Sequence, residues 1–444
     1  MGHSEDSAVK KNSSMFALIG LVLLFLTPFS ILKNMQIFFV AIVVASLLRL
    51  FVKWPKIGDR PIAVPLLSKL KRIHYCLLAI VLYELFDSLI SLLLLLSYDD
   101  VDVFGLLWRS FSQLAALLVY MLTTVCGYHM AVHFDIYHIR RAIYVPFFLM
   151  VAVCTYQVFS ESFGLPYIGN YVFDKFVGLR PSGLASEPKF LSSYFAVIIF
   201  FLLYDFRVRE RRASQFVYLI KLSGLMAAAY FFLAAASGNG FLSISILSLV
   251  YFSQMKIWQK LAVGGVIFMI LFWLWNQIGA GGIDLRGSHQ DILDNISSLD
   301  LTLFDDLIAL PLMAWRDNIW SLLIGFGPGL MHFFAHRYSN YSTWLTDETY
   351  IEGNLGVITF VSNFGLVLFI ILFVFFAKRG LATLKTQLQS AWFPVNLFFL
   401  SSFFVGALVQ GNSSIPFFLS LGWILRWSIQ RNIHNSDFQK FKLS

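Results

Sequence analysis

The feature that most constrains this chain is the repetition of apolar runs about as long as a bilayer is thick. A helix needs about 20 mostly apolar residues to cross the hydrocarbon core, and twelve runs come close to that length, the eighth and twelfth being short or interrupted. They lie at 14–32, 36–52, 73–97, 105–126, 142–159, 189–205, 215–236, 239–255, 261–279, 355–377, 391–409 and 416–430. With only 13% charged residues, the chain could not cover the surface of a soluble protein. The sequence therefore predicts an all-α polytopic membrane protein with about twelve transmembrane helices in a single transmembrane domain, 1–444.

Lysine and arginine residues predict the orientation, because they concentrate in cytoplasmic loops. The connection 53–72 holds six of them, and "RVRERR" at 207–212 holds four. With an even number of spans, both termini are then cytoplasmic and 280–354 lies outside. The net charge of +8 is explained by this topology, so the expected partner is the lipid bilayer and no nucleic acid is indicated.

Two predicted external segments, 160–188 and 280–354, exceed the length of a simple turn and are expected to carry function. The second contains "DDLIALPLMAWRDNIWSLLIG", whose apolar residues recur at helical spacing and predict an amphipathic helix within 303–324. It ends in "GFGPGLM", where three glycines and a proline in 325–329 predict a turn whose backbone can approach a ligand closely.

Charged residues inside the predicted spans are expected to have partners, because an ionised group is costly at the bilayer centre. Glu84 and Asp87 are three residues apart and share one helix face. We expect them to form a buried ion pair with Lys221 or Arg109, and a route for a proton or substrate is the alternative. The nine histidines are scattered without ligand spacing, and no phosphate-binding glycine loop occurs, so neither a metal site nor a cofactor is predicted.

Several motifs, in their order along the chain, carry a resemblance. "RPSGLASEP" precedes a mid-chain span, a large external loop closes with "WRDNIWSLLIGFGPG", and "NLGVITFVSNFGLVLF" opens the next span. Arg180, Gly183 and Pro188 meet the first family pattern, and 325–329 meets a Gly-x-Gly-Pro-Gly turn. Over roughly residues 70–430 the chain resembles the bacterial O-antigen polymerase and O-antigen ligase superfamily.

The resemblance implies a metal-independent membrane glycosyltransferase of the GT-C type in the bacterial inner membrane, with its site facing the periplasm. The segment 160–188 would then be the first periplasmic segment, and 280–354 the large periplasmic loop. The implied activity is that of a polysaccharide polymerase, which transfers a growing glycan from undecaprenyl diphosphate to the non-reducing end of an incoming lipid-linked repeat unit. The product would be O-antigen of lipopolysaccharide or another surface polysaccharide. Undecaprenyl-diphosphate-linked oligosaccharides are the implied substrates, and a chain-length regulator is a further candidate partner.

That transfer requires permanently charged cations near the leaving group, because negative charge grows on the departing diphosphate. Arginine offers forked donors that match phosphate oxygens. Arg180 and Arg316 are therefore the first catalytic candidates and Arg286 is a third diphosphate ligand. Interfacial snorkelling is the alternative role for Arg180. The further substrate-binding candidates are Gly183, Gly327, His332 and His336.

The general base is less well defined. Glu348 and Glu352 lie nearest the mouth of the following span, where a base could deprotonate a sugar hydroxyl, and a solvated loop edge is the alternative for both. Glu187 either orients Arg180 or caps the helix that begins at Pro188.

Two other functions compete with the polymerase. An O-antigen ligase would use lipid A-core as acceptor, but Asn354 occupies the position where the ligase branch carries a histidine. A flippase or secondary transporter would show repeat symmetry between its halves, and no such repeat occurs in the sequence. The polymerase is therefore favoured.

Overall fold

The structure is a computed structural model of the chain. It describes residues 36–53, 64–96, 103–166, 171–174, 178–185, 187–205, 215–235, 237–252, 306–336, 356–386, 390–410 and 415–427, together with residues 19, 20 and 22. The predicted span 261–279 and most of the span 14–32 lie outside these residues.

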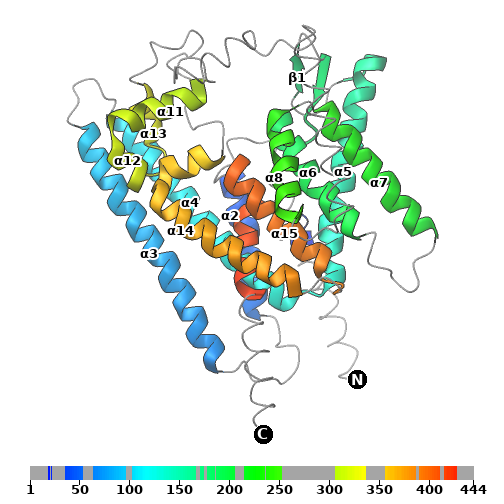
Figure 1. Ribbon diagram of the computed structural model, residues 1–444, viewed down its shortest axis with the longest axis horizontal. Coiled ribbons are helices and arrows are strands. Elements are labelled where there is room, and N and C mark those ends of the chain that lie inside the picture. Colours follow the sequence, from blue (N-terminus) through cyan, green and yellow to red (C-terminus); the bar gives the residue numbers. More distant parts are fainter. Residues whose placement is uncertain are drawn as a thin grey trace. The chain divides into compact units, whose positions relative to one another are not determined.

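The described chain is predominantly helical (Figure 1). Its longer helices are α2 (Gln36–Lys53), α3 (Val64–Leu95), α4 (Val103–His133), α5 (Ile136–Phe163), α6 (Pro188–Asp205), α7 (Gln215–Ala234), α8 (Gly238–Phe252), α14 (Gly356–Thr386), α15 (Phe393–Val405) and the helix Ile415–Trp427. The shorter elements are the strands β1 (Tyr171–Asp174) and β2 (Gly178–Pro181), the helices α11 (Asp306–Asp317), α12 (Ile319–Ile324) and α13 (Met331–His336), and the π-helical turn η4 (Gly406–Gln410).

Six described helices are long and apolar enough to cross a membrane. They are Val103–Ala131, Ile136–Ser160, Pro188–Asp205, Gln215–Ala234, Gly356–Lys385 and Phe393–Gln410. Large apolar side chains on α7 point away from the protein; Phe216 and Met226 are 69% and 65% exposed. Such a surface is stable in lipid, where the helix satisfies its own backbone hydrogen bonds. The chain is thus a predominantly helical membrane protein, and the full set of twelve spans stays a prediction.

The chain divides into two compact units. Unit 1 comprises residues 1–83, 115–243 and 372–444, and unit 2 comprises residues 84–114 and 244–371.

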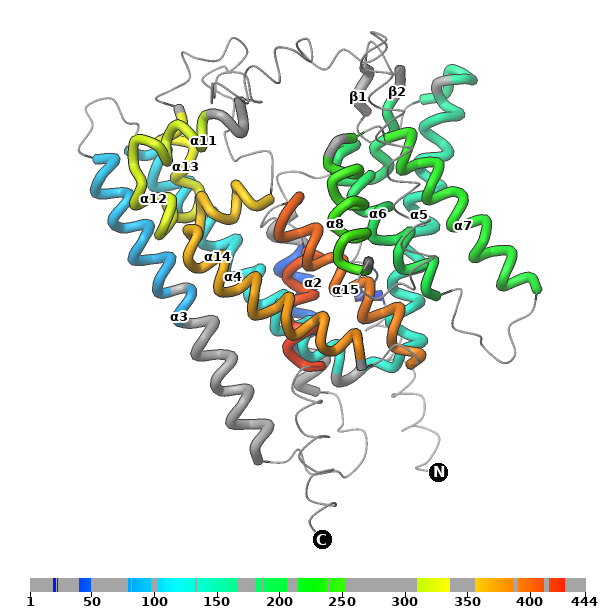
Figure 2. Tube along the Cα trace, in the orientation of Figure 1, coloured from blue at the N-terminus to red at the C-terminus, as the bar shows by residue number. Residues whose placement is uncertain are grey.

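Unit 1 is built around α15, which is buried along its whole length. Helix α6 packs against both α15 and α7 (Figure 2), and stacked aromatic rings fill the contacts, as between Phe399 and Trp423 with centroids 4.3 Å apart. A second close contact joins α4 to the helix Ile415–Trp427. A Cβ atom on Gly127 would overlap the Leu419 carbonyl, and one on Gly422 would overlap the Thr124 carbonyl. Small residues thus allow these two helices to touch backbone to backbone, as is common in membranes.

Contacts between helix ends show that neighbouring helices of unit 1 alternate in direction. The start of α5 meets the end of α6 through Arg140 and Asp205, and the end of α6 meets the start of α7 through Asp205 and Lys221. We call this the basic end; it also contains Trp392 and Arg426. At the opposite end, here called the hairpin end, Gln157 near the end of α5 bonds Gly183 and Arg180 bonds Ala235. Under the charge rule the basic end is expected to be the cytoplasmic one.

The strands β1 and β2 pair in antiparallel register, with Val172 opposite Arg180. They lie within the predicted external segment 160–188 and add a small hairpin to the expected all-α fold. Aromatic and β-branched residues in "YVFDKFVGLRP" favour strands, and this segment is too short and too polar to form a span. The expected helix within 303–324 is confirmed as α11 and α12.

The N-terminus of α5 provides a first prediction. Asp135 caps this helix, because its Oδ1 accepts a hydrogen bond of 2.9 Å from the His138 amide. Partial burial alone would raise the pKa of Asp135, but the bonds from the His138 amide and ring lower it below its usual value. Asp135→Ala should therefore cost about 1 kcal/mol of unfolding free energy near neutral pH. That difference should shrink as the pH falls below the ordinary aspartate pKa of about 3.9, because a lowered folded-state pKa contributes stability that is lost as the carboxylate becomes protonated. Unfolding of both proteins in mixed micelles at pH values above and below that pKa measures it.

Candidate functional site

Arg180 is fixed at the hairpin end of unit 1. It lies on β2, and its Nε and Nη2 both donate to the Ala235 carbonyl, at 3.0 and 2.8 Å. That carbonyl directly follows the last residue of α7, where the helix dipole favours a cation. The guanidinium is thereby held in one orientation beside the ends of two membrane-spanning helices, and it is only partly buried.

Gly183 forms the turn between Arg180 and α6. Its amide donates to Gln157 Oε1 at 2.8 Å, and its carbonyl accepts from Gln157 Nε2 at 3.0 Å. Its φ of +60° favours glycine, and an added Cβ would overlap Met150 Sδ. The spacing between Arg180 and Gly183 therefore reflects a buried turn that is clamped onto α5, and it is this turn that carries Arg180.

Of the two roles predicted for Glu187, pairing with Arg180 is not found among the described contacts. Its carboxylate pairs with Lys189 at 2.8 Å, while its backbone carbonyl accepts from the Phe190 and Leu191 amides at the start of α6. Its side chain therefore contributes an exposed ion pair beside the helix start.

In unit 2 the predicted Gly/Pro turn is confirmed between α12 and α13. Gly325, Gly327 and Gly329 have φ values of +100°, +81° and +77°. All residues of 325–329 are buried. Cβ atoms on Gly327 and Gly329 would crowd Ser88 of α3 and Gln113 of α4, respectively. The glycines thus let the turn pack closely on two helices, and Figure 1 shows α11, α12 and α13 beside the C-terminal part of α3.

The same turn fits against a break in α14. Gly365 interrupts that helix with φ +78° and ψ 156°, and the Phe326 amide donates to the Ser362 carbonyl at 2.6 Å. A Cβ on Gly325 would lie 2.7 Å from the Asn363 carbonyl oxygen. The motifs "GFGPG" and "NFG", which are far apart in sequence, are therefore two halves of one backbone contact.

The ion pair expected for Glu84 and Asp87 is wrong. Both side chains are buried, with 0% and 2% exposure, and within the described part of the chain none of their carboxyl oxygens has a hydrogen-bond partner. Lys221 pairs with Asp205 instead, at 2.7 Å. A carboxyl group in such surroundings is stable when it carries a proton or when a cation accompanies it.

The other predicted residues of unit 2 have different environments. Arg316 is exposed and its Nε contacts Asp317 Oδ1 at 3.0 Å. His332 is buried on α13, and His336 is the last residue of that helix. Arg109, not predicted for the site, lies with its Cζ 5.9 Å from the Phe333 ring centroid. Arg286, Glu348 and Glu352 lie outside the described residues.

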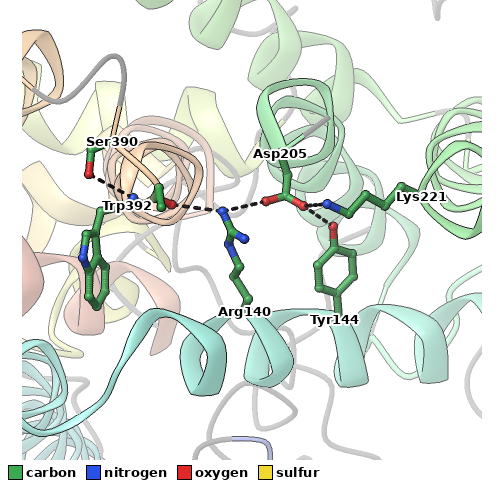
Figure 3. Close-up of polar contacts among 7 residues, drawn as sticks. Arg140, Tyr144, Asp205, Lys221, Ser390 and Trp392 are labelled. Carbon is green, nitrogen blue, oxygen red and sulfur yellow. Dashed lines mark hydrogen bonds and ion pairs between the residues drawn. The ribbon is translucent and has the colours of Figure 1, made fainter. Parts of the chain in front are cut away.

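A buried charge cluster at the basic end was not predicted from the sequence (Figure 3). Asp205, only 1% exposed, contacts Lys221 Nζ at 2.7 Å, the Tyr144 hydroxyl at 2.7 Å and Arg140 Nη2 at 3.3 Å. Arg140 Nη2 also donates to the Ala391 carbonyl at 3.0 Å. The cluster joins α5, α6, α7 and the connection before α15. The local sequence signal was weak, because Asp205 stands at the end of an apolar run next to "RVRERR" and reads as part of a solvated loop.

No group of three or more His, Cys, Asp or Glu side chains within the described ranges is arranged to hold a metal ion. No protein-family model matches the chain, and no curated protein shows significant similarity to it. The resemblance to the O-antigen polymerase and ligase superfamily therefore rests on the motifs quoted above.

Proposed function

We propose that the protein is a lipid-linked oligosaccharide polymerase of the bacterial inner membrane. It would transfer a growing glycan from undecaprenyl diphosphate to the non-reducing end of an incoming lipid-linked repeat unit, on the periplasmic side. The observation that carries the proposal is the fixed guanidinium of Arg180 at the hairpin end of unit 1, opposite the basic end.

The position of Arg180 suits a leaving diphosphate for two reasons. The Ala235 carbonyl holds the guanidinium before substrate arrives, so that little reorganisation is needed during the reaction. Its charge is permanent and its donors are planar, and both properties match a diphosphate whose negative charge increases as the anomeric C–O bond breaks. Arg316 stays a second candidate ligand for a diphosphate, and its exposed side chain is consistent with that role.

Substitution of Arg180 tests the proposal. Arg180→Ala and Arg180→Lys are each expected to slow polymerisation roughly 100- to 1000-fold, because a missing donor to a developing anion costs about 2.7–4 kcal/mol. Arg180→Lys should lower the rate of polymerisation nearly as much as Arg180→Ala, since an ammonium group lacks the planar, forked donors of a guanidinium. The measurement is the length distribution of surface polysaccharide in a deletion strain that carries each variant, with protein level in the membrane determined in parallel.

The matched control is Lys189→Ala, which removes a cation from the same end of unit 1 without touching Ala235. It should leave the chain length unchanged. Wild-type chain length in Arg180→Lys would mean that Arg180 has only an interfacial role. The deletion strain itself separates the functions: single repeat units on the surface indicate a polymerase, accumulated lipid-linked polymer a ligase, and repeats trapped inside the cell a flippase.

A further inference from the structure

Arg426 stands out at the basic end of unit 1. It lies in the last turn of the helix Ile415–Trp427, and its Nε and Nη1 are buried without a hydrogen-bond partner in the described part of the chain. A buried carboxyl group can accept a proton and become neutral, but a guanidinium stays charged in proteins. The site around Arg426 therefore requires an acceptor that the described protein residues do not provide.

An aromatic neighbour of Arg426 also presents a polar atom without a partner among the described residues. Arg426 Cζ lies 5.7 Å from the Tyr128 ring centroid, and the Tyr128 hydroxyl is buried without a hydrogen bond. Two helices bring these groups together, because Gly422, one turn before Arg426, packs directly on the backbone of α4 at Thr124 and Tyr128. A guanidinium and a phenolic hydroxyl together form a donor set that suits an oxyanion.

Among the described residues, the carboxylates at the basic end do not supply that anion. The Asp205 carboxylate is already bound by Arg140, Lys221 and Tyr144, and the Asp135 carboxylate is bound by the amide and ring of His138. The cluster of Arg140, Lys221 and Asp205 together with Arg426 carries a net positive charge, which favours the binding of an anion.

Two half-buried indole rings indicate the depth of the site in the membrane. Trp392 lies 5.3 Å from Trp427, centroid to centroid. Tryptophan is enriched where hydrocarbon meets the lipid headgroups, and phosphate groups lie at that level. Basic side chains at this depth on the cytoplasmic side interact with phospholipid headgroups.

We propose that Arg426 and Tyr128 form a binding site for the phosphate of a phospholipid headgroup at the basic end of unit 1. The guanidinium of Arg426 would donate to phosphate oxygens, and a rotation of the buried Tyr128 side chain would let its hydroxyl donate a further hydrogen bond. The site is separate from Arg180 and does not depend on the polymerase proposal.

The test is a titration of the purified full-length protein in a neutral detergent. A short-chain phosphatidylglycerol is added in one series and inorganic phosphate in another, and bound ligand is measured by native mass spectrometry. The wild type should bind the lipid, whereas Arg426→Gln should bind it roughly 10- to 100-fold more weakly, as expected for a lost hydrogen bond to a charged group. Tyr128→Phe keeps the ring and should weaken binding less than Arg426→Gln does. Inorganic phosphate should not bind at concentrations that saturate the site with lipid.

Arg379→Gln is the matched control, because Arg379 is another partly buried arginine of unit 1, with its Cζ 4.0 Å from the Phe375 centroid. This variant should bind lipid like the wild type. Equal lipid binding by Arg426→Gln and the wild type would overturn the proposal, and equal binding of inorganic phosphate would overturn the assignment to lipid. If Arg426→Gln fails to fold, lipid binding by Tyr128→Phe tests the proposal instead. Binding equal to that of the wild type would then contradict the proposed site.

Discussion

Replacing Asp205 with alanine is expected to lower the free energy of unfolding by about 3–5 kcal/mol, as removal of one partner of a buried ion pair does. The carboxylate neutralises two buried cations, Arg140 and Lys221, whose side chains are only 8% and 13% exposed. Without Asp205 both cations would remain in a site that excludes water. The loss should also loosen the contacts among α5, α6 and α7, since the cluster joins all three helices.

Chemical unfolding in mixed micelles measures this effect, and Glu187→Ala provides the matched control at the other end of α6. Glu187 forms an exposed pair with Lys189, and its side chain is 41% exposed, so its removal should cost less than about 1 kcal/mol. Asp205→Asn should fall between the two, because it keeps hydrogen-bonding atoms but loses the charge. Equal stability of Asp205→Ala and Glu187→Ala would show that the cluster contributes no more than a surface pair.

The sequence predicted the helices well where they are long and apolar, because hydrocarbon allows a spanning segment few alternatives to a helix. The alternating directions in unit 1 also follow from the spans and the basic connections. The hairpin of β1 and β2 was not predicted, since two strands of four residues give little periodicity.

Pairing between helices could not be predicted in the same way. The spacing of Glu84 and Asp87 shows that they share a helix face, but it does not show which helix covers that face. Lys221 was a reasonable partner by charge alone. In the structure its partner is Asp205, because α7 packs against α6. Choosing among the available partners requires the tertiary arrangement of the helices.

The glycine motifs illustrate a second limit. The sequence predicted a turn at 325–329 correctly and suggested that its backbone approaches a ligand. In the structure the close approaches are to Ser88, Gln113 and Asn363 within unit 2. A glycine that is required for backbone packing and one that is required for ligand binding look the same in a single sequence, because both need only the absence of a side chain.

Gly365→Ala is expected to be strongly destabilising in unit 2. The residue has φ +78° and ψ 156°, a combination that essentially only glycine adopts and that costs other residues about 1–3 kcal/mol. An added Cβ would also overlap the Leu323 carbonyl and the Ile324 backbone. These are backbone atoms of α12, which cannot rotate away as a flexible side chain could. Forcing such a contact typically adds about 1–3 kcal/mol.

The total loss for Gly365→Ala should therefore be about 2–6 kcal/mol, measured by unfolding in mixed micelles and by protease cleavage of the turn 325–329. Gly164→Ala separates the two contributions. Gly164 also has a positive φ, +62°, but an added Cβ there would meet no atom within 4 Å, so only the conformational cost of about 1–2 kcal/mol remains. If Gly365→Ala were no more destabilising than Gly164→Ala, the turn and the break in α14 would not be in the tight contact described above. A larger effect for Gly365→Ala, with faster cleavage at the turn, would tie the two glycine motifs together as one structural element.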